Sequence, residues 1–253
     1  MIRMFRAHLC AGVLLVLAGL SAGASALAHG PSPHPAATPG EPAEASLFAR
    51  TPEFDYDPPE PGTYELPPLR DAVDGAVLDS NGKALRLSGV RHGKITLLSF
   101  IYTNCTDDKG CPLASAVLSD ILLASTRDSN LAEHLKIVSL SFDAVHDTPK
   151  VMADYAAPLL APFEGRRRSE WAFLTAASER ELKHLLAGYD QFVIPNLGPD
   201  KILDGTFEHL LRVYLVDRSG RVRNVYGVSL LDPRLLIADV KTLLMEERDG
   251  IRQ

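Results

Sequence analysis

Residues 94–103 are apolar at almost every position. A continuous apolar run of this kind is typical of a strand covered on both faces, whereas strict alternation indicates a strand with one exposed face. Residues 135–142 form a second apolar run, and residues 171–175 resemble a short third strand. The pattern therefore predicts a buried sheet in which residues 94–103 form the central strand.

Helical patterns alternate with these strands. Pro112 suits the first turn of a helix, where its missing N–H costs no hydrogen bond, and apolar residues then recur at helical spacing up to Leu122. Three later helices are predicted by a capping side chain or a proline followed by an apolar stripe, and they begin at Thr148-Pro149, Ser178 and Asp232-Pro233.

Two hairpins flank this alternating part. The first covers residues 73–87 and turns at Asn81-Gly82, a pair that readily adopts positive φ angles, and the second covers residues 210–226. Residues 196–207, just before the second hairpin, have no regular pattern. After the first hairpin, the element order β-α-β-α-β-α-β-β-α predicts an α/β fold, a three-layer sandwich with a central mixed sheet, and a thioredoxin-like arrangement fits it best.

The two ends of the chain predict three regions. Residues 1–28 have arginines at their start, an uncharged apolar stretch and a closing Ala26-Leu27-Ala28, which is the pattern of a cleaved signal peptide. We expect export to a bacterial periplasm, and an uncleaved membrane anchor facing that compartment is the alternative. Residues 29–68 are rich in Pro, Ala, Gly and Glu and predict a flexible tether, which leaves residues 69–253 as the folded domain.

The charge of the chain narrows the class of partner. The formal net charge is −6, and removal of the signal peptide with its two arginines, Arg3 and Arg6, lowers it to −8. Nucleic acid is therefore not an expected partner, whereas a cation or a cationic protein is compatible with this charge.

Cys105 and Cys111 are the most informative residues because they lie where the predicted central strand passes into a helix. Open α/β sheets usually place their binding crevice at this end of the strands. Cys111 is expected at the helix N-terminus, where the backbone N–H groups and the helix dipole favour thiolate. The third cysteine, Cys10, lies in the predicted signal peptide. The pair therefore predicts soft-metal binding or redox chemistry, with a structural disulfide as the alternative.

Two thiolates and one imidazole form a three-coordinate site that suits copper. His209 and His146 are the leading candidates for the imidazole. His209 follows the irregular stretch at the start of a predicted strand, and His146 follows the second core strand at the same edge of the sheet as the cysteines. Position alone leaves both candidates open.

The chain resembles the SCO/SenC family of exported, thioredoxin-like copper proteins that help to build the binuclear copper centre of cytochrome c oxidase. The resemblance covers residues 67–244, and five stretches carry it: Phe100-Ile-Tyr-Thr-Asn-Cys105, Cys111-Pro112-Leu113, the Ser141 to Pro149 segment, Trp171-Ala-Phe-Leu-Thr175, and His209 to Gly220. Two features depart from the family pattern. Five residues rather than three separate the cysteines, and Ala144 replaces the proline that usually follows Asp143.

The resemblance implies that Cys105, Cys111 and His209 are ligands of Cu(I) or Cu(II), and that Asp143 supports the site. It also implies a copper carrier that delivers its metal to the copper-centre subunit of cytochrome c oxidase or to a related copper enzyme, with other copper carriers as further partners. The alternative is a periplasmic thiol–disulfide oxidoreductase, in which Cys105 and Cys111 form the redox pair that reduces the copper-ligand cysteines of a partner.

Overall fold

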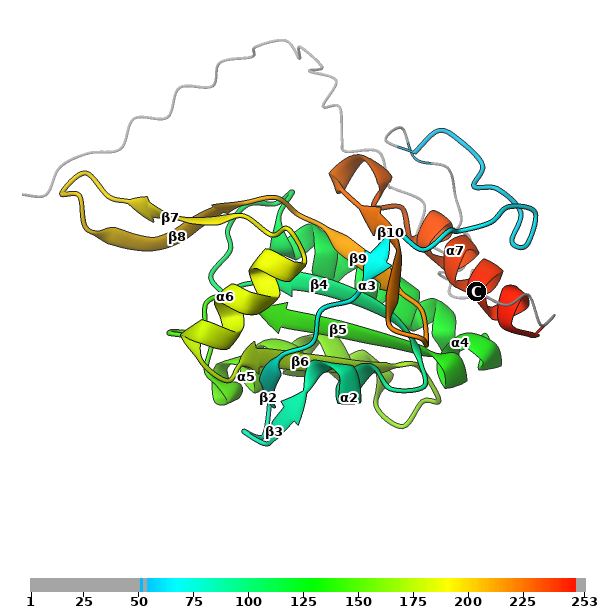
Figure 1. Ribbon diagram of the computed structural model, residues 1–253, viewed down its shortest axis with the longest axis horizontal. Helices are drawn as coiled ribbons and strands as arrows, with labels where there is room; N and C mark the ends of the chain where they lie inside the picture. Colours follow the sequence, from blue (N-terminus) through cyan, green and yellow to red (C-terminus); the bar gives the residue numbers. More distant parts are fainter. Residues whose placement is uncertain (1–50, 52–53, 249–253) are drawn as a thin grey trace, which may run out of the picture. The chain divides into compact units, whose positions relative to one another are not determined.

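The computed structural model describes residue 51 and residues 54–248 (Figure 1). The predicted signal peptide, its alternative as a membrane anchor, and the first part of the predicted tether lie outside the described residues. Among the helices of the described part, none has the length and apolar character needed to cross a bilayer.

The described residues form an eight-stranded mixed sheet. Its strands follow the order β1-β10-β9-β4-β5-β6-β2-β3 across the sheet. Their bounds are β1 (Arg70–Asp71), β2 (Ala76–Asp79), β3 (Ala84–Arg86), β4 (Ile95–Ile101), β5 (Leu135–Ser141), β6 (Glu170–Ala176), β9 (Val213–Val216) and β10 (Arg221–Tyr226). Both predicted hairpins, β2–β3 and β9–β10, are confirmed, and Gly82 has the positive φ of +80° that its turn requires.

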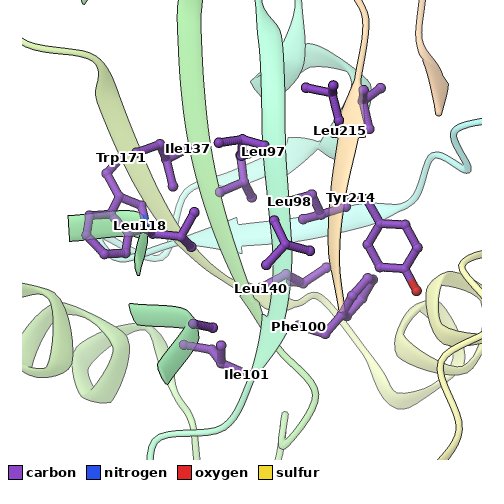
Figure 2. Close-up of a cluster of buried hydrophobic side chains, with 14 of the residues drawn as sticks. Leu97, Leu98, Phe100, Ile101, Leu118, Ile137, Leu140, Trp171, Tyr214 and Leu215 are labelled. Carbon is purple, nitrogen blue, oxygen red and sulfur yellow. The ribbon is translucent and has the colours of Figure 1, made fainter. Parts of the chain in front are cut away.

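β4 is the central strand, as its continuous apolar run predicted. It pairs in parallel with β5 on one side and antiparallel with β9 on the other, and all seven of its residues are buried. Figure 2 shows the apolar side chains around β4, with Phe100 beside Tyr214 of β9 at a ring-centroid distance of 6.0 Å. Because no face of β4 meets water, every one of its side chains can be apolar or small.

Helices pack on both faces of the sheet. On one face, the Phe100 ring lies 5.3 Å from that of Tyr189, the residue that follows α6. Across β5, Phe100 is in register with Leu174, so the preceding residue, Phe173, points to the opposite face of the sheet. There the Phe173 ring lies 6.1 Å from that of Tyr155 on α5. The Tyr155 hydroxyl hydrogen-bonds Ser115 of α3 at 2.7 Å. These contacts confirm the predicted three-layer α/β sandwich.

The helices begin close to where the sequence predicted them. Thr148 and Ser178 cap α5 and α6 by accepting hydrogen bonds from backbone N–H groups in the first turn, as the two capping patterns implied. The bounds are α2 (Leu87–Arg91), α3 (Cys111–Ser125), α4 (Ser129–His134), α5 (Pro149–Leu160), α6 (Glu179–Gly188) and α7 (Pro233–Arg248), with short 3-10 turns η1 (Ala161–Phe163) and η2 (Val228–Leu230).

Residues 54–66 contact the C-terminal part of the domain, although the sequence predicted a tether up to residue 68. The Tyr64 hydroxyl donates a 2.6 Å hydrogen bond to Asp239 on α7, and the Phe54 carbonyl accepts one of 2.8 Å from Arg234. Leu66 is buried, and its carbonyl accepts a hydrogen bond from Arg223. These polar contacts hold the segment against the domain, which a reading of its proline-rich composition could not anticipate.

The stretch that the sequence left without a pattern forms a separate two-stranded antiparallel sheet, β7 (Val193–Leu197) with β8 (Leu203–His209). Figure 1 shows this hairpin reaching beyond the edge of the main sheet. Its register shifts between Pro195 and Leu197, and several of its apolar residues are exposed, so the alternation that identifies an ordinary half-buried strand is missing.

Candidate metal centre

Three separate elements supply the predicted ligand residues. β4 ends at Ile101, and the loop that follows it carries Cys105. Cys111 is the first residue of α3, with Pro112 in the first turn as predicted. His209 is the last residue of β8, at the base of the β7–β8 hairpin.

The structure brings these three side chains together. Their ligand atoms, the two Sγ atoms and one imidazole nitrogen, all lie within 4.8 Å of one another. The Cys111 Sγ atom lies 3.6 Å from His209 Nε2. A sulfur and a nitrogen that bind one ion of zinc size lie about 3.5–3.8 Å apart, so this pair already has the separation of two ligands. Both cysteines are free thiols.

Burial dominates the chemistry of Cys111. Its side chain is 1% exposed, and this burial raises the pKa of the Cys111 thiol well above its usual value, with the neighbouring Cys105 adding to the effect. The Tyr102 N–H donates to Cys111 Sγ at 3.4 Å, which opposes the shift. The backbone N–H of Cys111 itself, at the N-terminus of α3, also favours the thiolate as the sequence predicted, but burial outweighs both N–H groups. A positive ion bound beside the sulfur would supply the missing compensation for thiolate charge.

His209 lies among aromatic rings. Its ring centroid is 4.8 Å from that of Phe142 and 6.0 Å from that of Tyr102, and Phe207 packs against both of these aromatic residues at 5.5 and 5.1 Å. Burial lowers the pKa of the His209 imidazole. The neutral form is the one that binds metals, so the aromatic surroundings prepare the imidazole to act as a ligand.

Asp147 anchors the loop between β4 and α3, a role that sequence reasoning did not assign. Its buried carboxylate accepts hydrogen bonds from the Thr103 N–H at 3.0 Å, from the Thr103 hydroxyl, and from the Ser141 hydroxyl at 2.6 Å. The sequence did contain a signal, because Ser141 ends the second core strand and Asp147 follows it at the edge of the sheet that carries the cysteines. Asp147 thereby ties the start of the cysteine loop to β5.

Asp143 and His146 form a pair of their own. The His146 Nδ1 atom lies 2.8 Å from a carboxylate oxygen of Asp143, and the His146 side chain is 69% exposed. Neither residue belongs to the group of potential ligands that the structure brings together. His209 is thus the histidine beside the cysteines, while the supporting role expected for Asp143 remains a prediction.

The absence of a side chain at Gly110 leaves room for the Cys105 sulfur. A methyl group at Gly110 would lie 3.1 Å from Cys105 Sγ and 3.1 Å from the Asp107 carbonyl oxygen. We expect Gly110→Ala to displace the Cys105 sulfur and to weaken metal binding by about tenfold, the lower end of the loss typical of altering residues that support a ligand. Competition with a chelator measures this. Gly227→Ala is the matched control, since nothing lies within 4 Å of its added methyl group. Equal affinities of the two variants would contradict the prediction.

Known proteins resemble this chain in sequence and in fold. The SCO1/SenC family model matches residues 76–245. A comparison with curated proteins gives no match. Among solved structures, Arabidopsis thaliana ScoI with copper bound has 20% identity and a TM-score of 0.57, and the match covers 69% of this chain and 98% of that one.

Two further solved structures extend the comparison. Yeast Sco1 with copper bound has 21% identity and a TM-score of 0.54, over 74% of this chain and 96% of that one. BsSco, a member of the Sco family of cytochrome c oxidase assembly proteins in which a disulfide switch has been identified, has 25% identity and a TM-score of 0.55, over 73% and 98%. These likenesses confirm the predicted thioredoxin-like fold. Since the family model spans well over half of the sequence, the chain belongs to the SCO1/SenC family.

Proposed function

We propose that this protein is a copper carrier that holds one copper ion with Cys105, Cys111 and His209. The observation that carries the proposal is the convergence of two thiols and one imidazole from three separate elements on one point. Thiolate sulfur and imidazole nitrogen form a donor set that copper favours over harder ions. The copper bound to the Arabidopsis and yeast relatives supports the same choice of metal.

The different burial of the two cysteines suits a carrier that must release its cargo. Cys111 is buried, whereas Cys105 is partly exposed on its loop. An incoming thiolate or imidazole of an acceptor can therefore approach the ion from the Cys105 side and displace the ligands one after another. The oxidation state of copper does not change in such an exchange, and each released thiolate of the carrier takes up a proton.

We propose that the acceptor is the copper centre of cytochrome c oxidase or of a related copper enzyme. The membership of BsSco in a family of cytochrome c oxidase assembly proteins supports this choice. The signal-peptide pattern of residues 1–28 supports delivery in a bacterial periplasm after cleavage near Ala28, with retention as a membrane anchor as the alternative.

Thiol–disulfide exchange is the second candidate function, favoured by two free thiols in the same small site and by the disulfide switch of BsSco. Cys105 would be the attacking thiol, because burial disfavours the thiolate of Cys111. The partner would be a disulfide of a copper-binding protein, which is reduced to two thiols as Cys105 and Cys111 become a disulfide.

An anaerobic copper titration of the reduced chain at several pH values tests the carrier function. Because burial raises the pKa of the Cys111 thiol above its ordinary value near 9, copper must displace that proton throughout the neutral range. Burial lowers the pKa of His209 below its ordinary 6.5, so the imidazole has no proton to lose above that pH. We expect one copper per chain and an affinity that rises by at least about tenfold per pH unit between about 6.5 and 8. No stoichiometric copper, or a flat pH profile, would contradict the assignment.

A further inference from the structure

A groove of about 1000 Å³ lies beside the β7–β8 hairpin. The loop from Ala144 to Pro149 and helix α6 border it together with β8. Apolar side chains form most of its surface, among them Phe142, Leu182, Leu186, Val193, Leu203 and Phe207. A concave apolar surface of this size with a few polar groups is the usual form of a binding site.

The groove shares a wall with the candidate metal centre. Phe142 and Phe207 line the groove, and the Phe142 ring also packs on the His209 imidazole at 4.8 Å. Phe207 lies two residues before His209 on the same strand. A molecule in the groove would therefore sit next to the residues that we assign to copper.

Exposed apolar side chains continue from the groove along the hairpin. Ile194, Leu197, Ile202 and Leu203 are 58–66% exposed, and Val145, in the loop that borders the groove, is 79% exposed. Single exposed apolar residues need no explanation, but a cluster on one projecting hairpin indicates a surface that another molecule covers.

The charge of this region points to a basic occupant. The cysteine loop and the hairpin have two lysines, Lys109 and Lys201, and a third, Lys183, lines the groove but is paired with Glu179 at 2.7 Å. The carboxylates of the loop and the hairpin outnumber these lysines, and they belong to Asp107, Asp108, Asp200, Asp204 and Glu208. Asp107 is close enough to His209 to influence its pKa, which places the acidic loop beside the hairpin. A positively charged surface is therefore attracted to the same face as the metal centre.

A second copy of this chain fits this face poorly. Two copies would bring their acidic hairpins together, which is unfavourable for like charges. The hairpin also has a bulge near Pro195, and the Asp204 carboxylate accepts a 2.8 Å hydrogen bond from the Thr206 N–H. Both features oppose strand pairing at the edge of the hairpin. A partner would therefore contact the exposed apolar side chains of the hairpin rather than pair with its backbone.

We propose that the groove and the β7–β8 hairpin form the docking surface for the copper acceptor, and that the acceptor contributes a segment in which basic residues alternate with bulky apolar ones. The apolar side chains enter the groove, and the basic ones meet the carboxylates around it. The identification of the partner as the acceptor rests on the proposed carrier function, whereas the chemistry of the docking segment rests on the groove alone.

A labelled synthetic peptide of about ten residues, with alternating leucine and lysine, serves as the probe, and its fluorescence anisotropy with the full chain measures binding. The double variant Ile202→Asn, Leu203→Asn is expected to bind it about tenfold more weakly, because the anchoring apolar surface is lost. The matched control is Leu69→Asn, Leu230→Asn, which replaces two exposed apolar residues that lie neither in the groove nor on the β7–β8 hairpin.

The same peptide-binding measurement with Cys105→Ser separates this inference from the carrier function. That variant lacks a copper ligand, but it should bind the peptide as tightly as the original chain does. Three outcomes would overturn the docking proposal. They are equal weakening in the control variant, equal binding of a peptide that alternates leucine and glutamate, and a concentration-dependent dimer that disappears in the groove variant. The last outcome would assign the face to a second copy.

Discussion

Replacing Cys111 by serine is expected to abolish stoichiometric copper binding by the reduced chain, with an affinity loss of more than about a hundredfold. Removing a ligand costs more than the ten- to hundredfold loss typical of altering the residues that support one. The sulfur lies 3.6 Å from His209 Nε2 and has no substitute among the potential ligands that the structure groups there. Anaerobic competition with a Cu(I) chelator measures the effect, and His209→Ala should also lose binding.

His146→Ala is the matched control for His209→Ala. His146 is the other histidine at this end of the sheet, but its side chain is largely exposed and pairs with Asp143. Its removal should leave copper affinity unchanged. The histidine variants also separate the two candidate functions, because disulfide exchange needs only the cysteines and should survive in His209→Ala. Retained copper in His209→Ala, or its loss in His146→Ala, would refute the assignment of the ligands.

Arg223→Met should destabilise the fold by about 3–5 kcal/mol, the cost of removing one partner from a buried ion pair. The buried Arg223 guanidinium lies 3.1 Å from Asp217 and 2.8 Å from Glu246, and it also donates to the Leu66 carbonyl. Methionine keeps much of the side-chain volume but leaves two buried carboxylates without this cation. Denaturation in urea measures the change in the free energy of unfolding.

The control for this variant is Arg167→Met. Arg167 pairs with Glu133 at 3.1 Å, but both side chains are more than half exposed, and exposed pairs contribute only about 0–1 kcal/mol. The two substitutions are chemically identical and differ in burial. If both variants lost the same free energy of unfolding, the buried network would not have the stabilising role that we assign to it.

The sheet could be predicted from the sequence because its two central strands, β4 and β5, are continuous apolar runs. β4 and β5 are covered on both faces, so their apolar runs are continuous and could be recognised without any knowledge of their partners. Helix starts were equally clear where a proline or a capping side chain stands at the first turn, as Thr148 does before α5. These signals are local, which is why a single sequence revealed them.

The parts that could not be predicted depend on contacts between distant residues. The segment that contains Tyr64 is held by a hydrogen bond to Asp239, 175 positions later, and no local sequence pattern indicates such a bond. The β7–β8 hairpin is held partly by pairing between its own strands and exposes apolar residues, so it lacks the alternation of an ordinary strand. In both cases composition indicated a loop where tertiary structure provides order.

For the candidate site, the cysteine pair could be predicted from its position at the end of the central strand, but the histidine could not. Residue position left His146 and His209 equally suitable, and only the resemblance to a known family favoured His209. The structure explains why, since the hairpin returns the chain to the cysteines at His209. The raised pKa of the Cys111 thiol could not be predicted from the sequence either, because it results from burial, which is a property of the whole fold.

The metal centre joins parts of the chain that are far apart in the sequence, since His209 lies 98 positions after Cys111. An unfolded chain therefore does not hold all three ligands together, although it keeps the two cysteines close in sequence. Copper capture and folding become linked equilibria, so that the metal stabilises the native state by the free energy with which it binds. The complete three-ligand site would form only in the folded chain, so the copper content of a preparation would report its folded fraction.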